Sequence, residues 1–342
     1  MRISRAAIAL GAVAGLLTGI LVGAPAAAAE HVSMLMDFLW QSSQGGFTLA
    51  ADRGYYAAEG LEVSIDHGQG SGDTISKVAS GTYDIGFADI NLLVKFNAEN
   101  PNNRVKAFFV AYDASLASIV TLARTGIKAP KDLEGRTIAA PDYDNVRMLF
   151  PTFARLAGID AAKVKWLSVQ GQLRDTMLAQ GHADASASFS TTAYLALTSF
   201  GIPPADIVTM RYVDYGLDLY GSALVASERT IAERPKLLAG VARAVVHGLK
   251  DALARPEDAV ASIRQRDPLL KDDVELQRFN MVAKQSMVTP SVRRLGLGAA
   301  DPERLARTIG FVAEAFKIAN PPRPDDVYTG AFLPPREARL VN

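Results

Sequence analysis

Short apolar runs alternate with segments of helical periodicity through the first two thirds of the chain. The runs that predict strands are Met34–Leu39, Leu61–Ile65, Asp84–Ala88, Val105–Ala111, Ser118–Ala123, Thr137–Ala140, Val164–Val169, Ala183–Ala187, Ile207–Met210 and Ser222–Ala226. The segments between them that predict helices include Gly46–Tyr56, Thr74–Ser80, Asn145–Leu156 and Leu173–Gln180. Because strands and helices alternate, the pattern indicates an α/β fold with largely parallel sheets.

The pattern changes after Ser227, where only helical periodicity remains. The predicted helices of this part are Thr230–Ala254, Glu257–Arg266, Asp272–Ser286 and Pro302–Ile318, followed by a proline-rich tail. The C-terminal third is therefore predicted to be a helical layer.

An internal repeat links two parts of the α/β region. The first copy runs through Gln69-Gly70, Asp73-Thr74 and Gly81-x-x-Asp84, and the second through Gln170-Gly171, Asp175-Thr176 and Gly181-x-x-Asp184. Each copy reads as strand, glycine turn, helix, turn and strand. The repeat favours two similar lobes that face each other across a cleft, over the alternative that such turns are common in α/β chains.

The N-terminus has the three parts of a secretory signal peptide. Arg2 and Arg5 are basic, Ala6–Val22 is almost wholly apolar, and Ala26–Ala29 offers small residues for cleavage after Ala29. The alternative is a single membrane-anchoring helix. We expect residues 1–29 to be removed and the protein to be exported to the periplasm.

Composition excludes several classes of function. The chain has 342 residues with 36 basic and 36 acidic side chains, a balance that does not fit a nucleic-acid-binding protein. It has no cysteine, which excludes thiol catalysis and cysteine-ligated metals. The four histidines are scattered, and after Gly68-x-Gly70 the sequence has Asp73 at the position where a dinucleotide fingerprint requires its third glycine. We therefore expect no catalytic residue, metal or cofactor.

Five segments carry a resemblance to a known family: Trp40–Val63, Gly68–Asp73, Gly81–Gly86, Lys131–Ala139 and Asp214–Tyr220. Together they resemble the NMT1/THI5-like periplasmic solute-binding proteins, the receptors of ABC importers for nitrate, sulfonates, taurine and thiamine pyrimidines.

The resemblance implies a type II-like periplasmic-binding-protein fold with mixed sheets. Lobe one would comprise residues 30–114 and 222–342, lobe two residues 115–221, with crossings near Tyr112–Ser118 and Tyr220–Ala223. A monomer would capture a small solute between the lobes and deliver it to an inner-membrane ABC permease, with no cofactor. A thiamine-pyrimidine synthase of the same fold is the enzyme alternative, although that family uses a cysteine-rich motif and iron, and this chain has no cysteine.

Candidate ligand-binding residues lie in turns that follow predicted strands or open helices. In lobe one they are Trp40, Gln41, Gln44, Ser71, Gly72, Asp73, Asp89 and Asn91, and in lobe two and its second crossing Asn145, Arg147, Ser188, Tyr212, Asp214, Tyr215 and Tyr220. Trp40 either stacks on a planar solute or caps the core. Arg147 either grips an anionic group or lies on a solvated helix face.

The candidates leave two ligand classes open. Trp40 and the tyrosines favour a planar aromatic or heterocyclic solute, such as a pyrimidine precursor or an aromatic carboxylate. Arg147 and the helix N-termini would instead serve a sulfonate or nitrate.

Overall fold

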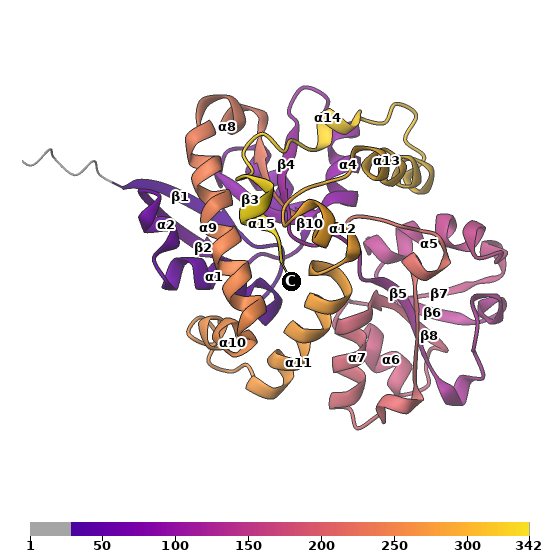
Figure 1. The fold of residues 1–342 in the computed structure, drawn as a ribbon. Coiled ribbons are helices and arrows are strands. Elements are labelled where there is room, and N and C mark those ends of the chain that lie inside the picture. Colours follow the sequence, from indigo (N-terminus) through magenta and orange to yellow (C-terminus); the bar gives the residue numbers. More distant parts are fainter. Residues whose placement is uncertain (1–28, 342) are drawn as a thin grey trace, which may run out of the picture.

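The computed structural model describes residues 29–341, so the predicted signal peptide lies almost entirely outside the described residues. The strands form two five-stranded sheets (Figure 1). The first sheet has the order β2-β1-β3-β10-β4 and comprises β1 (Glu30–Leu35), β2 (Leu61–Asp66), β3 (Ile85–Asp89), β4 (Val105–Val110) and β10 (Ser222–Ser227). The second has the order β7-β6-β8-β5-β9 and comprises β5 (Ala117–Leu122), β6 (Thr137–Ala140), β7 (Lys165–Ser168), β8 (Ala185–Phe189) and β9 (Ile207–Arg211).

The two sheets are built alike. In the first, β1 runs parallel to β2 and β3, and β10 is antiparallel to β3. In the second, β6 runs parallel to β7 and β8, and β5 is antiparallel to β8. The sequence repeat corresponds to equivalent helices, α3 (Ser71–Ala79) before β3 and α6 (Arg174–Ala179) before β8. The prediction of an α/β fold with mixed sheets flanked by helices is confirmed.

Helices surround both sheets. Those of the first-sheet unit, in chain order, are α1 (Gly45–Asp52), α2 (Tyr55–Ala58), α3, α4 (Ile90–Glu99), α8 (Glu228–Glu233), α9 (Pro235–Ala254), α10 (Pro256–Arg264), α11 (Asp272–Val282), α12 (Pro290–Leu295), α13 (Pro302–Phe316), α14 (Pro324–Val327) and α15 (Arg336–Arg339). The second-sheet unit contains α5 (Asn145–Leu156), α6 and α7 (Ser190–Ser199). The long helix α9 packs against α1 and α2, and α1 also packs against α10 (Figure 1).

The C-terminal helices also touch the second-sheet unit at two places. Helix α11 packs against α7, and α13 packs against α5 (Figure 1). Between α5 and α13, Arg155 forms a bidentate ion pair with Glu314, with N–O distances of 2.6 and 2.7 Å. The helical third therefore flanks the junction between the two sheets on both sides.

The two chain segments that connect the units are held by one side chain. Arg304 of α13 pairs with Asp113, which follows β4, at 2.9 Å and with Asp218, which precedes β10, at 2.6 Å. Its guanidinium lies 4.1 Å from the ring centroid of Tyr220. Gly221 allows the segments to approach closely, because a Cβ atom there would lie 2.8 Å from the Cβ of Tyr112. Both connections are thus fixed to α13.

Several element bounds differ from the predicted ones. Strand β1 ends at Leu35, four residues before its predicted end at Leu39. Its register pairs Glu30 with Leu61 and Leu35 with Asp66, so each of its six residues has a partner in the six-residue strand β2. The predicted helix over residues 46–56 is two helices, since Gly54 adopts a left-handed conformation (φ 71°) between them.

The C-terminal helical predictions are also divided. Pro235 lacks an N–H group and starts α9, so the predicted helix over residues 230–254 breaks after α8. Helix α11 continues as a π-helical turn, η7 (Ala283–Met287). Helices α4 and α7 were absent from the predicted set because both begin directly at a strand end, without a loop to mark them.

The described part of the chain contains neither a membrane-spanning helix nor a group of side chains that could hold a metal ion. No helix between residues 29 and 341 is long and apolar enough to cross a bilayer. In the same range, no three histidine, aspartate or glutamate side chains are grouped so that they could hold a metal ion.

Candidate functional site

The two sheet units meet where their parallel strands end. Asp89 is the last residue of β3, and Asn145 is the first residue of α5, which follows β6. The Nδ2 group of Asn145 donates a hydrogen bond of 3.2 Å to Oδ1 of Asp89. Carboxyl ends of strands are the usual ligand-binding edge of α/β sheets. We call this place, with the side chains described below, the strand-end junction.

A second carboxylate, Asp37, lies beside Asp89 in the loop after β1. It accepts a hydrogen bond of 3.3 Å from the Ser71 hydroxyl and one of 3.5 Å from the amide of Gln44. Ser71 also links the two acids, since its Oγ accepts a hydrogen bond from the Asp89 backbone N–H. Burial, and secondly the charge of Asp89, raises the pKa of Asp37 from 3.8 to about 7.

Asp89 is 4% exposed and caps helix α4. Its Oδ1 accepts hydrogen bonds from the backbone N–H groups of Asn91 and Leu92, at 2.8 and 3.3 Å. Burial raises the pKa of Asp89 from 3.8 to about 6, although those N–H groups act in the opposite direction. The junction therefore holds two neighbouring carboxyl groups that are costly to ionise without a positively charged or N–H-donating partner.

Three buried polar atoms at the strand ends have no hydrogen-bond partner within residues 29–341: Oδ1 of Asn91, Oδ1 of Asn145 and Oγ of Ser188. Asn91 and Ser188 are fully buried, and Asn91 lies two residues after Asp89. Buried polar groups are nearly always paired, so such a group at a strand end indicates a missing partner.

A small apolar cluster contains residues of both units. Leu116, Val282 and Met287 form a buried cluster, and the partly buried rings of Tyr112 and Phe189 pack against it. Tyr112 follows β4 of the first sheet, and Phe189 ends β8 of the second. The Tyr112 hydroxyl donates to the backbone carbonyl of Ser43, and burial raises the pKa of Tyr112. Aromatic rings from both units thus pack against the same apolar cluster.

A second hydrogen bond joins the units at the π-helical turn. The Ser190 hydroxyl, at the start of α7, donates to Oε1 of Gln285 in η7 at a distance of 2.8 Å. In the same turn, the Ser286 carbonyl accepts from the backbone N–H of Asp113. π-Helical turns are rare and recur at functional sites. The turn ties α7 and the first crossing to the C-terminal helices.

The structure brings together part of the predicted site. Gln44, Ser71, Asp89, Asn91 and Asn145 all lie at the strand-end junction and are connected through the contacts above. That these residues bind a solute stays a prediction.

Other predicted residues lie close to this group without a direct contact to the carboxylates. Gln41 accepts a hydrogen bond of 3.5 Å from Arg278, and the Arg278 guanidinium pairs with Glu275 at 3.1 Å. Trp40 packs against the first-sheet core, with its ring edge-on to His67 at 6.0 Å. Both readings of Trp40 therefore remain open.

The predicted aromatic and acidic cluster around the second crossing is not at the junction. Tyr212 is 1% exposed, stacks on Phe153 at 4.2 Å and donates its hydroxyl to the carbonyl of Val146. Tyr220 is also fully buried, beneath Arg304. The sequence predicts both rings as solute contacts because they belong to an aromatic and acidic cluster near the second crossing, whereas in the structure both are packed as core residues.

The remaining members of that cluster belong to the outside of the second-sheet unit. Exposed Asp214 pairs with Arg211 in a bidentate contact. Tyr215 packs edge-on against Phe153, at 5.7 Å. Neither residue is hydrogen-bonded to Asp37 or Asp89, and their role as solute contacts stays a prediction.

Three further residues that were predicted to bind the solute lie in the first turn of a helix, and none of them is hydrogen-bonded to Asp37 or Asp89. Arg147 is used within its own unit: it pairs with Asp142 at 2.6 Å, donates to Ser168 and lies over the Trp166 ring at 4.8 Å. Asp73 is exposed and pairs with Lys77 one turn along α3. Gly72 is exposed, and a Cβ atom there would meet nothing within 4 Å. That Arg147 binds an anionic group stays a prediction, and its guanidinium already has these partners within its own unit.

Sequence reasoning missed Asp37, Tyr112 and Phe189. Asp37 was assigned to the interior of a strand, because the apolar run continues through Phe38 and Leu39. A signal was nevertheless present: a single acidic residue inside an apolar run is costly to bury. Phe38 and Leu39 are in fact 43% and 53% exposed, in the loop that follows β1.

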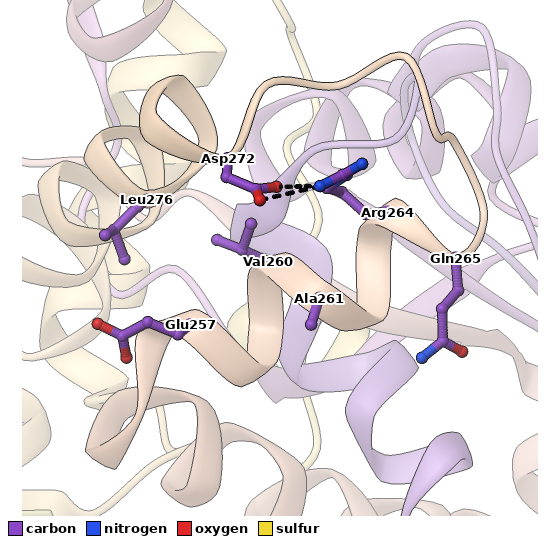
Figure 2. A pocket seen from close by; sticks show the side chains of 7 residues that line it. All are labelled: Glu257, Val260, Ala261, Arg264, Gln265, Asp272 and Leu276. Atoms are coloured by element: carbon purple, nitrogen blue, oxygen red, sulfur yellow. Dashed lines mark hydrogen bonds and ion pairs between the residues drawn. The ribbon is translucent and has the colours of Figure 1, made fainter.

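A separate groove of about 390 Å³ lies between α10 and α11 (Figure 2). Its lining includes Val260, Ala261 and Leu276, and an ion pair of 2.9 Å between Arg264 and Asp272 spans it (Figure 2). None of its lining residues was predicted as a site residue, and none has an unpartnered buried polar atom. The strand-end junction is therefore the stronger candidate.

A sequence model described as NMT1/THI5 like matches residues 41–259, more than half of the chain. The chain belongs to the NMT1/THI5-like family. This confirms the resemblance stated from the sequence segments.

Curated relatives and solved structures agree with this assignment. The chain is 24% identical over 314 residues to "Riboflavin-binding protein RibY" of Chloroflexus aurantiacus, a match that covers 89% of this chain and 86% of the relative. It is 27% identical over 240 residues to "Formylaminopyrimidine-binding protein" of Halalkalibacterium halodurans, covering 68% and 69%. The solved structure of the periplasmic aliphatic sulphonate binding protein SsuA from Escherichia coli superposes with a TM-score of 0.66 at 14% identity, covering 92% of each chain. The fold is therefore that of periplasmic binding proteins.

Proposed function

We propose that this protein is the solute receptor of an ABC importer and that it captures a planar nitrogen heterocycle at the strand-end junction. In this proposal the two sheet units are the lobes, with lobe one comprising residues 30–114 and 222–342 and lobe two residues 115–221. The lobes close over the solute, and the closed receptor delivers it to a permease in the inner membrane. The protein is exported after cleavage behind Ala29, acts as a monomer and is not an enzyme.

The observation that carries the proposal is the composition of the junction. Asp89 of one unit is hydrogen-bonded to Asn145 of the other, and Asp37 lies beside Asp89. The ring of Tyr112 lies near Asp37, and it packs with Phe189 of the other unit on one apolar cluster. Aromatic faces pack against a flat ring, while carboxylates and an amide oxygen accept hydrogen bonds from ring or exocyclic N–H groups. A planar heterocycle satisfies both parts of this arrangement at once.

The relatives support the same ligand class. Both curated relatives are named for solutes that contain flat nitrogen rings, riboflavin and formylaminopyrimidine. The sulfonate and nitrate receptors among the solved structures are 12–16% identical and support the fold only. A small anion would also have to lie against two carboxyl groups, which disfavours the sulfonate or nitrate alternative.

The receptor reading also accounts for the cross-unit contacts. The Asn145–Asp89 and Ser190–Gln285 hydrogen bonds join the two units at the junction, where a closed binding protein has to hold its lobes together. The synthase alternative would need a cysteine-rich motif, and the sequence contains no cysteine. Both curated relatives are named as binding proteins.

Titration calorimetry tests the proposal. The full chain is expressed with its N-terminal segment, purified from the periplasmic extract, and unfolded and refolded to remove any retained solute. It is then titrated with riboflavin, 4-aminopyrimidine, butanesulfonate and nitrate. We expect at least one of the two heterocycles to bind, and X-ray scattering to show a smaller radius of gyration at saturation. Binding of butanesulfonate or nitrate with no response to either heterocycle would refute the ligand class.

A further inference from the structure

The carboxylate of Asp37 is under-supplied with hydrogen bonds. An ionised carboxylate has about four acceptor positions. Within residues 29–341, Asp37 receives two side-chain hydrogen bonds, of 3.3 Å from Ser71 and 3.5 Å from Gln44, both longer than the usual range, besides the contact of its own backbone N–H. Neither donor carries a positive charge. Asp37 therefore has room for further donors on the side that faces the junction.

Asn145 shows which kind of group the neighbouring acid accepts. Its amide N–H group donates to Oδ1 of Asp89 across the junction, and its own Oδ1 is left without a partner. The fully buried Asn91, two residues after Asp89, likewise has an unpartnered Oδ1. Carboxylate and amide oxygens are acceptors, and an amide oxygen cannot donate. All the unsatisfied groups of Asp37, Asn91 and Asn145 therefore require donors.

Positive side chains near the junction are already paired. Arg278, which reaches Gln41, pairs with Glu275 at 3.1 Å. Arg174 pairs with Asp144, the residue before Asn145, at 2.8 Å. Arg147 pairs with Asp142 at 2.6 Å. None of these three guanidinium groups is hydrogen-bonded to Asp37 or Asp89 within residues 29–341.

We infer that the solute is recognised by an edge carrying two adjacent N–H donors, as in an amidinium group or an amino-substituted nitrogen ring protonated on the adjacent ring nitrogen, which bridges Asp37 and Asp89. This inference rests on the proposed function and specifies the head group of its ligand. One N–H group binds the Asp37 carboxylate, and the second replaces the amide of Asn145 on Asp89. The released Asn145 side chain and Asn91 accept further donors of the same edge. Solutes with a carboxylate or sulfonate at this edge are rejected by charge.

Three probes with the same planar ring test the head group: benzamidine, benzamide and benzoate. Benzamidine carries two N–H donors and a positive charge, benzamide donates but is neutral, and benzoate only accepts. In calorimetric titrations at a fixed pH near neutrality or slightly above, we expect benzamidine to bind at least about tenfold more tightly than benzamide. Benzoate should show no saturable binding at the highest concentration used for benzamidine.

Conservative variants connect the preference to the two acids. Asp37→Asn and Asp89→Asn each keep the side-chain shape, and asparagine also serves as a helix N-cap at position 89. Each variant should weaken benzamidine binding by at least about tenfold and reduce the preference over benzamide. The matched control is Asp206→Asn, the same substitution at an exposed position of the second-sheet unit, which should bind benzamidine as the parent does. Circular dichroism of each variant verifies that it is folded.

The outcomes separate this inference from the proposed function. If benzoate binds as well as benzamidine, or if the two variants bind benzamidine unchanged, the inference is overturned while a receptor for planar solutes stands. If riboflavin or 4-aminopyrimidine binds and none of the three probes does, the head-group assignment is likewise overturned. If neither the heterocycles nor the probes bind, both the inference and the proposed function fail.

Discussion

Replacing Asp37 by asparagine should stabilise the solute-free protein at alkaline pH, although it weakens benzamidine binding. The reason is the raised pKa of the Asp37 carboxyl group in the folded state, which burial and the nearby Asp89 carboxylate cause. In the unfolded chain the group returns to its ordinary pKa. The folded protein therefore holds the proton more strongly, and its stability falls as the pH rises from the unfolded pKa through the folded one.

The magnitude follows from the two pKa values. A folded pKa of about 7 against an ordinary value of 3.8 is a difference of roughly three pKa units, or about 4 kcal/mol at full ionisation. At about pH 4.5 the penalty is only about 1 kcal/mol, because the folded group is still protonated. The free energy of unfolding of Asp37→Asn relative to the parent should thus increase by about 3 kcal/mol between about pH 4.5 and about pH 8.

Urea unfolding of the solute-free parent and variant at the two pH values measures this quantity, with tryptophan fluorescence as the signal. Trp40 and Trp166 report on the two units separately, so a loss of two-state behaviour would be detected. Asp206→Asn serves as the control and should show no such pH-dependent difference. If the stability difference between Asp37→Asn and the parent is the same at both pH values, Asp37 is not desolvated and the reasoning is wrong.

Three further predictions concern other parts of the chain. Tyr212→Ala should lower the free energy of unfolding by about 3–5 kcal/mol because it empties a core position, which urea unfolding measures; a change in solute affinity alone would contradict this. Trp40→Ala should weaken riboflavin binding by about tenfold or more in calorimetry if its ring contacts the solute, and a lower melting temperature with unchanged affinity would assign Trp40 to the core. Mass spectrometry of the exported protein should find Glu30 as its first residue, and an intact Met1 would refute cleavage.

The sequence pattern was sufficient for the fold because the strands and most helices leave strong local signals. Helix α5 has the predicted bounds, with Asp144 as its N-cap, and β6 has them as well. The missed divisions depend on single residues, Gly54 and Pro235, whose effect was underestimated inside long apolar patterns. The position of β1 depended on its register with β2, which is a non-local property.

Site residues could be predicted from the sequence only where they stand at a turn that the local sequence identifies. Ser71, Asp89 and Asn145 begin helices directly after strands or turns, and their sequence neighbours identify such positions. Tyr212 and Tyr112 have no such local mark. Whether a tyrosine ring points into the core or toward a cleft is decided by the partner element, α5 for Tyr212 and the η7 region for Tyr112, and these elements are distant in sequence.

The contact of Arg304 with both connections determines where a reporter of solute capture should be attached. A rotation of one unit that pulls either connection away from α13 would separate Arg304 from Asp113 or Asp218. The Arg304–Asp113 pair is buried, and breaking a buried ion pair costs about 3–5 kcal/mol. The axis of the movement should therefore pass close to Arg304, and displacements should grow with distance from it.

Strands β2 and β7 are the sheet edges opposite to β4 and β9, the strands next to the connections. Ser64 on β2 and Lys165 on β7 are exposed. Because the sequence has no cysteine of its own, Ser64→Cys with Lys165→Cys would accept a donor and an acceptor dye without background labelling. The chain thus has attachment points for a fluorescent sensor of its own solute, with the two dyes on the edge strands that lie opposite to the strands next to the connections.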